Sequence, residues 1–132
     1  MSDIVFQERL NRGSSSVLST TSNVDLKTVG TTNLYTVPAG KKAVITGLTI
    51  RPTSISGLIS VATIGVGVAA GEADILAATV LTGLTSTSSV FNILAQNIYA
   101  IANSADIIKA GVDVGSIGTA FIASIDLLGY LV

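Results

Sequence analysis

The residues of this chain that could carry out chemistry are few, and almost all of them are carboxylates. The 132-residue sequence contains no histidine and no cysteine, so it lacks the commonest general base and the usual ligands of zinc. A Ser-His-Asp triad, a cysteine nucleophile and a disulfide are excluded for the same reason. Carboxylates remain, and the candidates among them are a close pair, Glu72 and Asp74, and three scattered aspartates, Asp106, Asp113 and Asp126.

The sequence around these carboxylates supports neither catalysis nor cation binding. A two-carboxylate glycosidase needs a cleft and commonly uses aromatic platforms for the sugar, but the chain has three Tyr, three Phe and no Trp. Calcium prefers carboxylate and carbonyl oxygens, yet residues 71–74 do not form an EF-hand pattern. Residues 65–67, Gly-Val-Gly, lack the third glycine of a dinucleotide loop and the lysine of a P-loop. We therefore predict a protein that is not an enzyme and that has no cofactor or metal.

The composition favours a protein whose surface is covered by other protein surfaces. Charged residues make up 11% of the chain, apolar residues 48%, and the formal net charge is −1. A freely soluble monomer usually carries about 25–35% charged residues on its surface, and a weak overall field gives little protection against self-association. We therefore expect a homo-oligomer. The balanced charge also differs from the basic footprint of a nucleic-acid-binding protein.

The long uncharged stretches do not predict a membrane segment. Residues 52–71 and 75–105 contain no charged side chain, but Gly, Ser, Thr and Asn interrupt both of them. Neither holds the roughly 18 consecutive apolar residues of a spanning helix, and residues 1–13 lack the hydrophobic region of a signal peptide. We expect a protein that is made in the cytoplasm and has no membrane partner.

Residues 1–23 are predicted to form an N-terminal arm. Serine and threonine dominate residues 13–23, which is typical of an extended arm or loop. Such an arm could hook a neighbouring molecule through the apolar and basic side chains that precede this run, and a frayed terminus is the alternative. The candidate contact residues of the arm are Val5, Phe6, Arg9, Leu10 and Arg12.

From residue 24 onward the sequence predicts an all-β fold. Apolar and polar residues alternate over residues 24–29 and 43–51, and the alternation is longest over residues 121–131. Turn signals separate these segments, and no long 3.6-residue period is present. About eight short strands predict one β-sandwich or jelly-roll domain over residues 24–132.

Several positions within this domain carry more local expectations. Pro52 is expected to end a strand because it has no N–H to donate to a ladder, and Gly65 and Gly67 are expected to mark a bulge or a close backbone approach. Residues 72–80 fit either a short helix or a loop followed by a strand.

Two more surfaces are candidates for contact with a partner. Lys41 and Lys42 follow the turn signal of residues 38–40, Pro-Ala-Gly. This places adjacent cations at the tip of an expected hairpin, where they serve solubility or dock onto an acidic patch. Tyr130 and Leu131 belong to an apolar C-terminus, which would be a liability in water. We therefore expect them to lie in a sheet or at a subunit interface.

Residues 34–46, LYTVPAGKKAVIT, resemble the opening of small bacteriophage virion proteins that carry a Tyr-x-Val-Pro-Ala-Gly-Lys hairpin. Residues 124–131, SIDLLGYL, are similar to a closing strand of such proteins. The resemblance covers residues 24–132 and implies a β-sandwich in a capsid-decoration (cement) or tail position. It also implies a homo-oligomer, often a trimer, that binds the major capsid protein or other virion proteins, and it implies no catalytic residues.

Three functional hypotheses follow from the residues and this resemblance. The first is a phage capsid-decoration protein, made in the host cytoplasm and located in the virion. The second is a tail or neck structural protein, which a ring of six copies would favour. The third is a carbohydrate- or receptor-binding jelly roll, which calcium-dependent glycan binding would favour.

Overall fold

The computed structural model describes residues 16–68, 74–94 and 100–132, and within them the chain forms nine strands and no helix. No helix that could cross a membrane occurs in these three ranges. The strands are β1 (Ser16–Asp25), β2 (Gly30–Thr36), β3 (Ala43–Ser56), β4 (Thr63–Gly67), β5 (Leu76–Val80), β6 (Phe91–Leu94), β7 (Ala100–Ala102), β8 (Ile107–Val114) and β9 (Ala120–Leu131).

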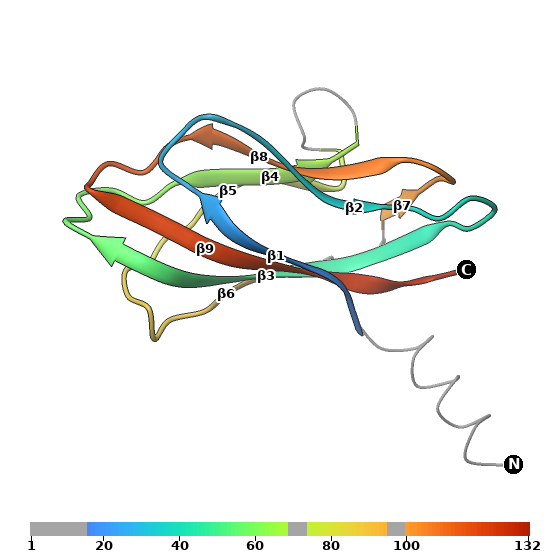
Figure 1. Ribbon diagram of the computed structural model, residues 1–132, viewed down its shortest axis with the longest axis horizontal. Coiled ribbons are helices and arrows are strands. Elements are labelled where there is room, and N and C mark those ends of the chain that lie inside the picture. The colour runs from blue at the N-terminus through green and yellow to red at the C-terminus, as the bar shows by residue number, and fades with distance from the viewer. Residues whose placement is uncertain (1–15, 69–73, 95–99) are drawn as a thin grey trace, which may run out of the picture.

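The strands form two antiparallel sheets that face each other (Figure 1). One sheet has the order β1-β9-β3-β6, with β7 also paired to β3, and the other has the order β2-β8-β4-β5. Because β9 occupies one side of β3, β6 and β7 are successive segments of a single edge on its other side. Counted in this way, each sheet has four strands, and every connection except β4–β5 crosses between the sheets. This is the jelly-roll arrangement, and the predicted all-β sandwich is confirmed.

The core lies between the two sheets and is built from alternate residues of the central strands. In β9 the inward-pointing side chains from Phe121 to Leu127 are fully buried, as the period-2 pattern of the sequence predicted. Strand β3 contributes its own inward row to the same layer, and β4 and β8 supply the facing layer. The fully buried side chains include Ile45, Leu48, Ile50, Ile64, Ile108, Phe121, Ile125 and Leu127.

Residues 16–23, which the sequence assigned to an arm, belong to the sandwich. They form most of β1, which pairs with β9 from Ser16 opposite Gly129 to Asp25 opposite Ile122. A run of serine and threonine is compatible with an edge strand because the backbone ladder holds it, and β-branched threonine suits a pleated surface. The five candidate contact residues of the arm lie outside the described residues.

Strand β3 continues through Pro52, contrary to the prediction that proline would end it. Pro52 lies opposite Ala123 of β9, and the ladder is irregular just beyond it. On the other side of β3, the last residue paired with β6 is Ile50. A proline is tolerated where one side of its strand is open, since its missing N–H then removes no ladder bond.

One of the local expectations is confirmed, one is corrected and one is resolved. The β4–β5 ladder is irregular between Ile64 and Val66, but two steps of β4 face the three steps of β5 from Thr79 to Leu76, so the extra residue lies in β5 and Gly65 is opposite it. The turn after β2 closes with a hydrogen bond from Lys41 N to Pro38 O at 3.1 Å. Its Gly40 has a φ of 76°, a conformation that glycine adopts at little cost. In the segment from 72 to 80, the described part contains strand β5 rather than a helix.

The turn at residues 38–40 is not the tip of a hairpin, however. Strands β2 and β3 pair with different partners and lie in different sheets. The turn therefore carries the chain from one sheet to the other. A local turn signal cannot distinguish these two connections, because both reverse the chain over the same few residues.

The close approach of β3 and β9 at Gly129 provides a test of this packing. A Cβ atom at Gly129 would collide with the backbone oxygen of Val44 and come within 3.1 Å of Cδ1 of Leu18. We expect Gly129→Ala to lower the free energy of unfolding by about 1–3 kcal/mol, the usual cost of overpacking. The measurement is urea denaturation followed by circular dichroism.

The matched control is Gly30→Ala, because a Cβ atom at Gly30 would have no neighbour within 4 Å. We expect this variant to stay within about 0.5 kcal/mol of the native protein. Equal effects of the two substitutions would contradict the packing described for β3 and β9.

Candidate functional site

Carboxylates that the sequence offered for catalysis are engaged in local turns. Asp74 Oδ1 accepts a hydrogen bond from the Val68 N–H at 3.0 Å. Asp106 Oδ2 accepts one from the Asn103 N–H at 2.9 Å. Glu72 lies outside the described residues. Within the described ranges no pocket forms, and no three acidic side chains gather where they could hold one metal ion.

Asp126 has a structural role on the outer face of the sheet that contains β9. Its carboxylate accepts two hydrogen bonds from Arg51, from Nε and Nη2, each at 3.1 Å. It also accepts a hydrogen bond of 2.7 Å from Thr20 Oγ1. Because these residues lie on β9, β3 and β1, the group ties three neighbouring strands together. Bidentate pairing with arginine holds both carboxylate oxygens in place.

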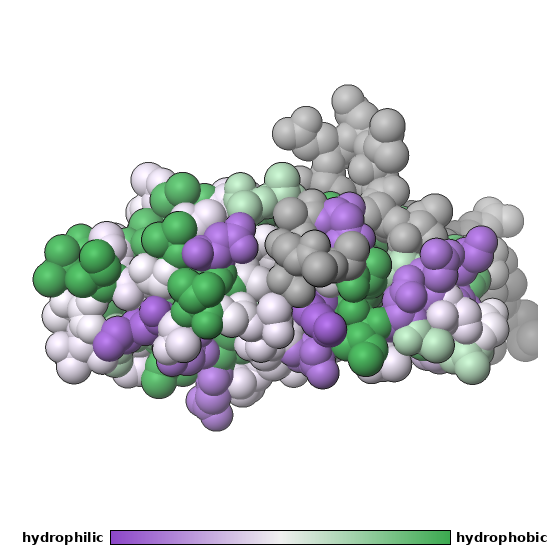
Figure 2. All heavy atoms as spheres, turned by 90° about the horizontal axis from the view of Figure 1, so that it is seen from above, coloured by the Kyte–Doolittle hydropathy of each residue, from purple (hydrophilic) through white to green (hydrophobic). Residues whose placement is uncertain are grey.

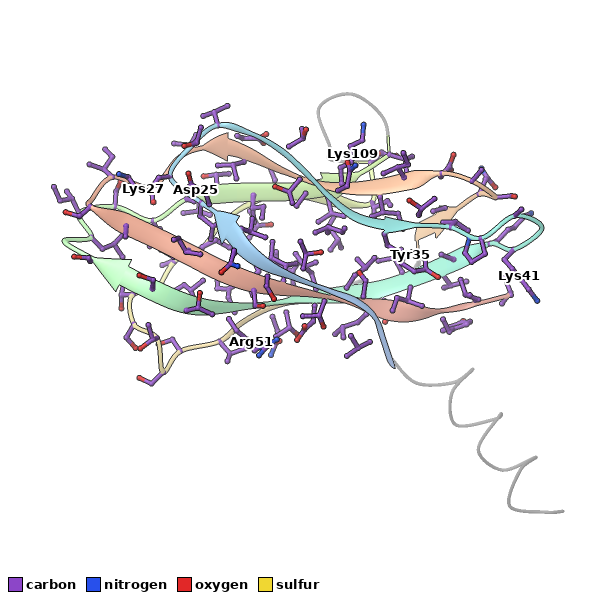
Figure 3. The ribbon with its side chains drawn as sticks, in the orientation of Figure 1. Asp25, Lys27, Tyr35, Lys41, Arg51 and Lys109 are labelled. Atoms are coloured by element: carbon purple, nitrogen blue, oxygen red, sulfur yellow. The ribbon has the colours of Figure 1, made fainter. Side chains whose placement is uncertain are left out.

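Four of the predicted contact residues come together at one end of the sandwich. The backbone of Lys42 exchanges hydrogen bonds with that of Val132, at 3.0 and 2.8 Å. In the adjoining ladder Leu131 pairs with Ala43, and Tyr130 pairs with Val44. Lys41 and Lys42 are exposed, whereas Tyr130 and Leu131 are half-buried. Lys41 projects from this end in Figure 3. The expectation that the apolar C-terminus lies in a sheet is confirmed.

The opposite end of the sandwich presents a second surface, which the sequence reading missed. Three loops meet there, and with Val114 at the end of β8 they form what we call the loop tip. The loops are the β1–β2 loop (residues 26–29), the β3–β4 loop (residues 57–62) and the β8–β9 loop (residues 115–119).

Backbone hydrogen bonds connect the three loops of the loop tip. Ser116 N donates to Leu26 O at 2.9 Å, which joins the β8–β9 loop to the β1–β2 loop. Ile117 N donates to Ser60 O at 3.1 Å, and Ile59 N donates to Ile117 O at 2.7 Å. The second pair of bonds joins the β8–β9 loop to the β3–β4 loop. Segments far apart in the sequence therefore form one continuous surface.

A carboxylate-centred turn fixes the β1–β2 loop within this surface. Asp25 Oδ1 accepts a hydrogen bond from the Lys27 N–H at 2.8 Å, and Asp25 Oδ2 accepts one from Thr28 Oγ1 at 2.9 Å. These two bonds, first that of Lys27 and then that of Thr28, hold the pKa of Asp25 below its ordinary value. Lys27 Nζ donates to Thr119 O at 3.2 Å and so reaches the β8–β9 loop. Figure 3 shows Asp25 and Lys27 at this end, opposite Lys41.

The loop tip exposes large apolar side chains. The exposed fractions are 79% for Ile59, 64% for Val29, 58% for Val114 and 57% for Ile117. Figure 2 shows apolar surface gathered at the end of the molecule where these loops lie. A sequence signal did exist, because β-branched apolar residues stand among Gly and Ser in turn-like segments. Their convergence on one surface depends on the tertiary fold.

Comparison with known proteins yields matches at the level of structure. No protein-family model matches the sequence, and a search of curated proteins finds no match. A chain in the acidic stable capsid structure of Helicobacter pylori bacteriophage KHP30 superposes with a TM-score of 0.57 and 12% identity, covering 90% of this chain and 95% of that one. A chain of the cyanophage Pam1 capsid asymmetric unit gives a TM-score of 0.52 and 13% identity, covering 89% and 83%.

The fold is shared with chains from two phage capsids. At these identities the likeness concerns the fold, and it extends over nearly the whole chain on both sides of the first comparison. Among the described residues, the exposed lysines at one end of the sandwich and the exposed apolar side chains at the other end still lack an assigned role.

The turn at Asp25 predicts a specific pH dependence. Because the pKa of Asp25 is lower in the folded protein, its contribution to stability is complete above the unfolded value of about 3.9 and is lost as the pH falls through the folded pKa. We expect Asp25→Asn to cost less than about 1 kcal/mol at pH 7, since the site is exposed. The gap between native and variant should stay constant from about pH 7 to 5 and close below about pH 4.

Urea denaturation of both proteins at several pH values measures this gap. Contributions that native protein and variant share cancel in this gap, so the difference isolates Asp25. A gap that widens below about pH 4 would contradict the assigned hydrogen bonds.

Proposed function

We propose that this chain is a structural protein of a bacteriophage virion and that it decorates the capsid as a cement protein. In this role it stabilises the shell through contacts among its own copies, as a trimer, and with the major capsid protein. The protein would be made in the host cytoplasm and act in the assembled particle. The proposed role is mechanical and involves no catalysis, cofactor, nucleic acid or membrane.

The observation that carries the proposal is the likeness to a chain in the KHP30 capsid structure. The match covers 90% of this chain and 95% of that chain, so the two are comparable as whole domains. A second likeness, to a chain of the Pam1 capsid, supports the same setting. Jelly rolls also occur in carbohydrate-binding proteins, so the fold supports a capsid position without being specific to it.

The surface of the molecule supports a role in assembly. The chain has a net charge of −1 and 11% charged residues, and apolar side chains are exposed on the loop tip. Apolar surface that is removed from water contributes about 25 cal/mol per Å² before the costs of association. A closed ring of such contacts would distribute internal pressure over many interfaces.

The described carboxylates support a non-catalytic role. Asp25, Asp74, Asp106 and Asp126 each accept hydrogen bonds within local turns or between strands. These bonds give each of the four carboxylates a structural role in a turn or between strands. Asp113 is an exposed residue near the end of β8.

Cosedimentation tests the proposal directly. Purified protein is mixed with capsids of its phage that lack it, and the pellet is analysed for bound copies. We expect saturable binding at a fixed number of copies per capsid, and a higher temperature of genome release from decorated particles. Absence of binding to capsids would refute the decoration role.

The same preparation separates the alternatives. A ring of six copies that binds tails or necks, and not capsids, would favour the tail position. Calcium-dependent binding to glycans, without binding to particles, would favour a carbohydrate-binding jelly roll.

The basic end of the sandwich provides a mutational test. Lys41 is exposed beside the C-terminus, and we propose that it faces an acidic patch of the capsid. We expect Lys41→Glu to reduce capsid occupancy several-fold at low salt and less at high salt, because exposed charge pairs are screened by ions. The matched control is Lys109→Glu on β8, which should bind capsids like the native protein. Equal occupancy for all three proteins would exclude this end as the contact.

A further inference from the structure

Exposed apolar side chains are concentrated on the loop tip, away from the basic end discussed above. Four of the nine large hydrophobic residues that are exposed within the described ranges lie there. Isolated apolar residues on a surface need no explanation, but a contiguous group of them marks an interaction site. Val80 lies at the same end on β5, across Thr63 of β4 from Val114, and the remaining four lie outside the loop tip: Val17, Val90, Ile107 and Val132.

The loop tip is preorganised. Besides the hydrogen bonds that join its loops, glycines allow the backbones to approach closely. A Cβ atom at Gly115 would collide with the carbonyl oxygen of Lys27, and one at Gly118 would lie 2.7 Å from Gly57 O. A surface held in this way loses little conformational entropy when a partner covers it, which favours binding.

The charge of the loop tip selects the kind of partner. Lys27 is the one charged residue in its three loops, and its ammonium group donates to Thr119 O. Asp25, which accepts a hydrogen bond from the Lys27 N–H, and the exposed Asp113, next to Val114, offset this single cation. A surface with so little net charge gives little attraction to a charged partner. It is suited to contact with its own copy, because residues near a rotation axis face the same residues of the neighbouring subunits.

We propose that the loop tip is the surface through which copies of this chain associate, with Ile59 and Ile117 close to the symmetry axis. The proposal rests on the virion role for its biological setting and identifies which end of the domain forms the oligomer. The basic end around Lys41 and Lys42 is then free to face another protein. The loop tip then contacts identical copies, and the basic end contacts the shell.

The test measures the mass of the protein in solution. Sedimentation of the native full-length protein over a range of concentrations should show an oligomer. We expect Ile59→Glu and Ile59→Lys to sediment as monomers at concentrations where the native protein is associated. The matched control is Ile107→Glu, at the opposite end of β8, which should remain associated. Circular dichroism of each variant shows whether the domain is folded.

Mixing the two charged variants identifies the occupant of the loop tip. If copies meet there as a trimer, each mixed trimer of the Ile59→Glu and Ile59→Lys proteins contains two unlike pairs and one like pair, so the mixture should associate more strongly than either variant alone. Folded variants that remain associated separately, or a native protein that is monomeric at all concentrations, would overturn the proposal. A mixture that associates no more strongly than the separate variants would also overturn it.

Capsid binding distinguishes this inference from the proposed function. A native oligomer that depends on Ile59 but does not bind capsids would refute the decoration role and leave the loop-tip interface standing. A native protein that binds capsids while Ile59→Glu retains its oligomeric state would refute the loop-tip interface and leave the decoration role standing.

Discussion

The antiparallel pairing of β3 with β9 is the interaction on which the rest of the structure depends. It joins residues 43–56 to residues 120–131, so the two halves of the ladder come from distant parts of the chain. Strand β1 attaches to the outer side of β9, and β6 and β7 attach to the outer side of β3. The buried faces of β3 and β9 form one layer of the core. Ladders of such large sequence separation form slowly, because loop closure must precede the contacts that reward it.

The two ends of the sandwich are consequences of this ladder. At one end, β3 begins and β9 finishes, so the residues after the β2–β3 turn lie beside the C-terminus. At the other end, β3 finishes and β9 begins, so the β3–β4 and β8–β9 loops are brought together. The crossing of β1 to β2 adds a third loop, which Asp25 and Lys27 hold in place. A jelly roll therefore gathers unrelated loops into surfaces that a partner can contact.

The outer edges of the sheets show how a weakly charged protein limits uncontrolled edge pairing. Exposed edge strands can recruit other chains, and natural proteins commonly protect them with charges, bulges or short strands. Here β6 and β7 are 4 and 3 residues long, and β1 is interrupted by two register shifts. The ion pair of Arg51 with Asp126, joined by Thr20, places a charged group across the face of the same sheet. Irregularity and local polarity thus take the place of a highly charged surface.

Much of the architecture followed from the sequence, because periodicity and turn chemistry are local properties. The alternation over residues 121–131 predicted β9 and its buried face, and the Pro-Ala-Gly segment predicted a turn with glycine at positive φ. The missing histidine and cysteine excluded whole classes of chemistry. The same local reading failed where a residue's role depends on its neighbours in space. It assigned residues 16–23 to an arm, ended a strand at Pro52 and took the β2–β3 turn for a hairpin.

What only the tertiary structure decided is which distant residues share a surface. Backbone pairing with β9 made a strand of the serine- and threonine-rich residues, and the open side of β3 made Pro52 acceptable. Ile59 and Ile117 are 58 positions apart in the sequence, and they meet because the strands that lead to them pair with each other. The physical reason is the same in each case: the sequence specifies which side chains alternate and where the chain can turn, whereas long-range hydrogen-bonded pairing specifies the neighbours of each strand.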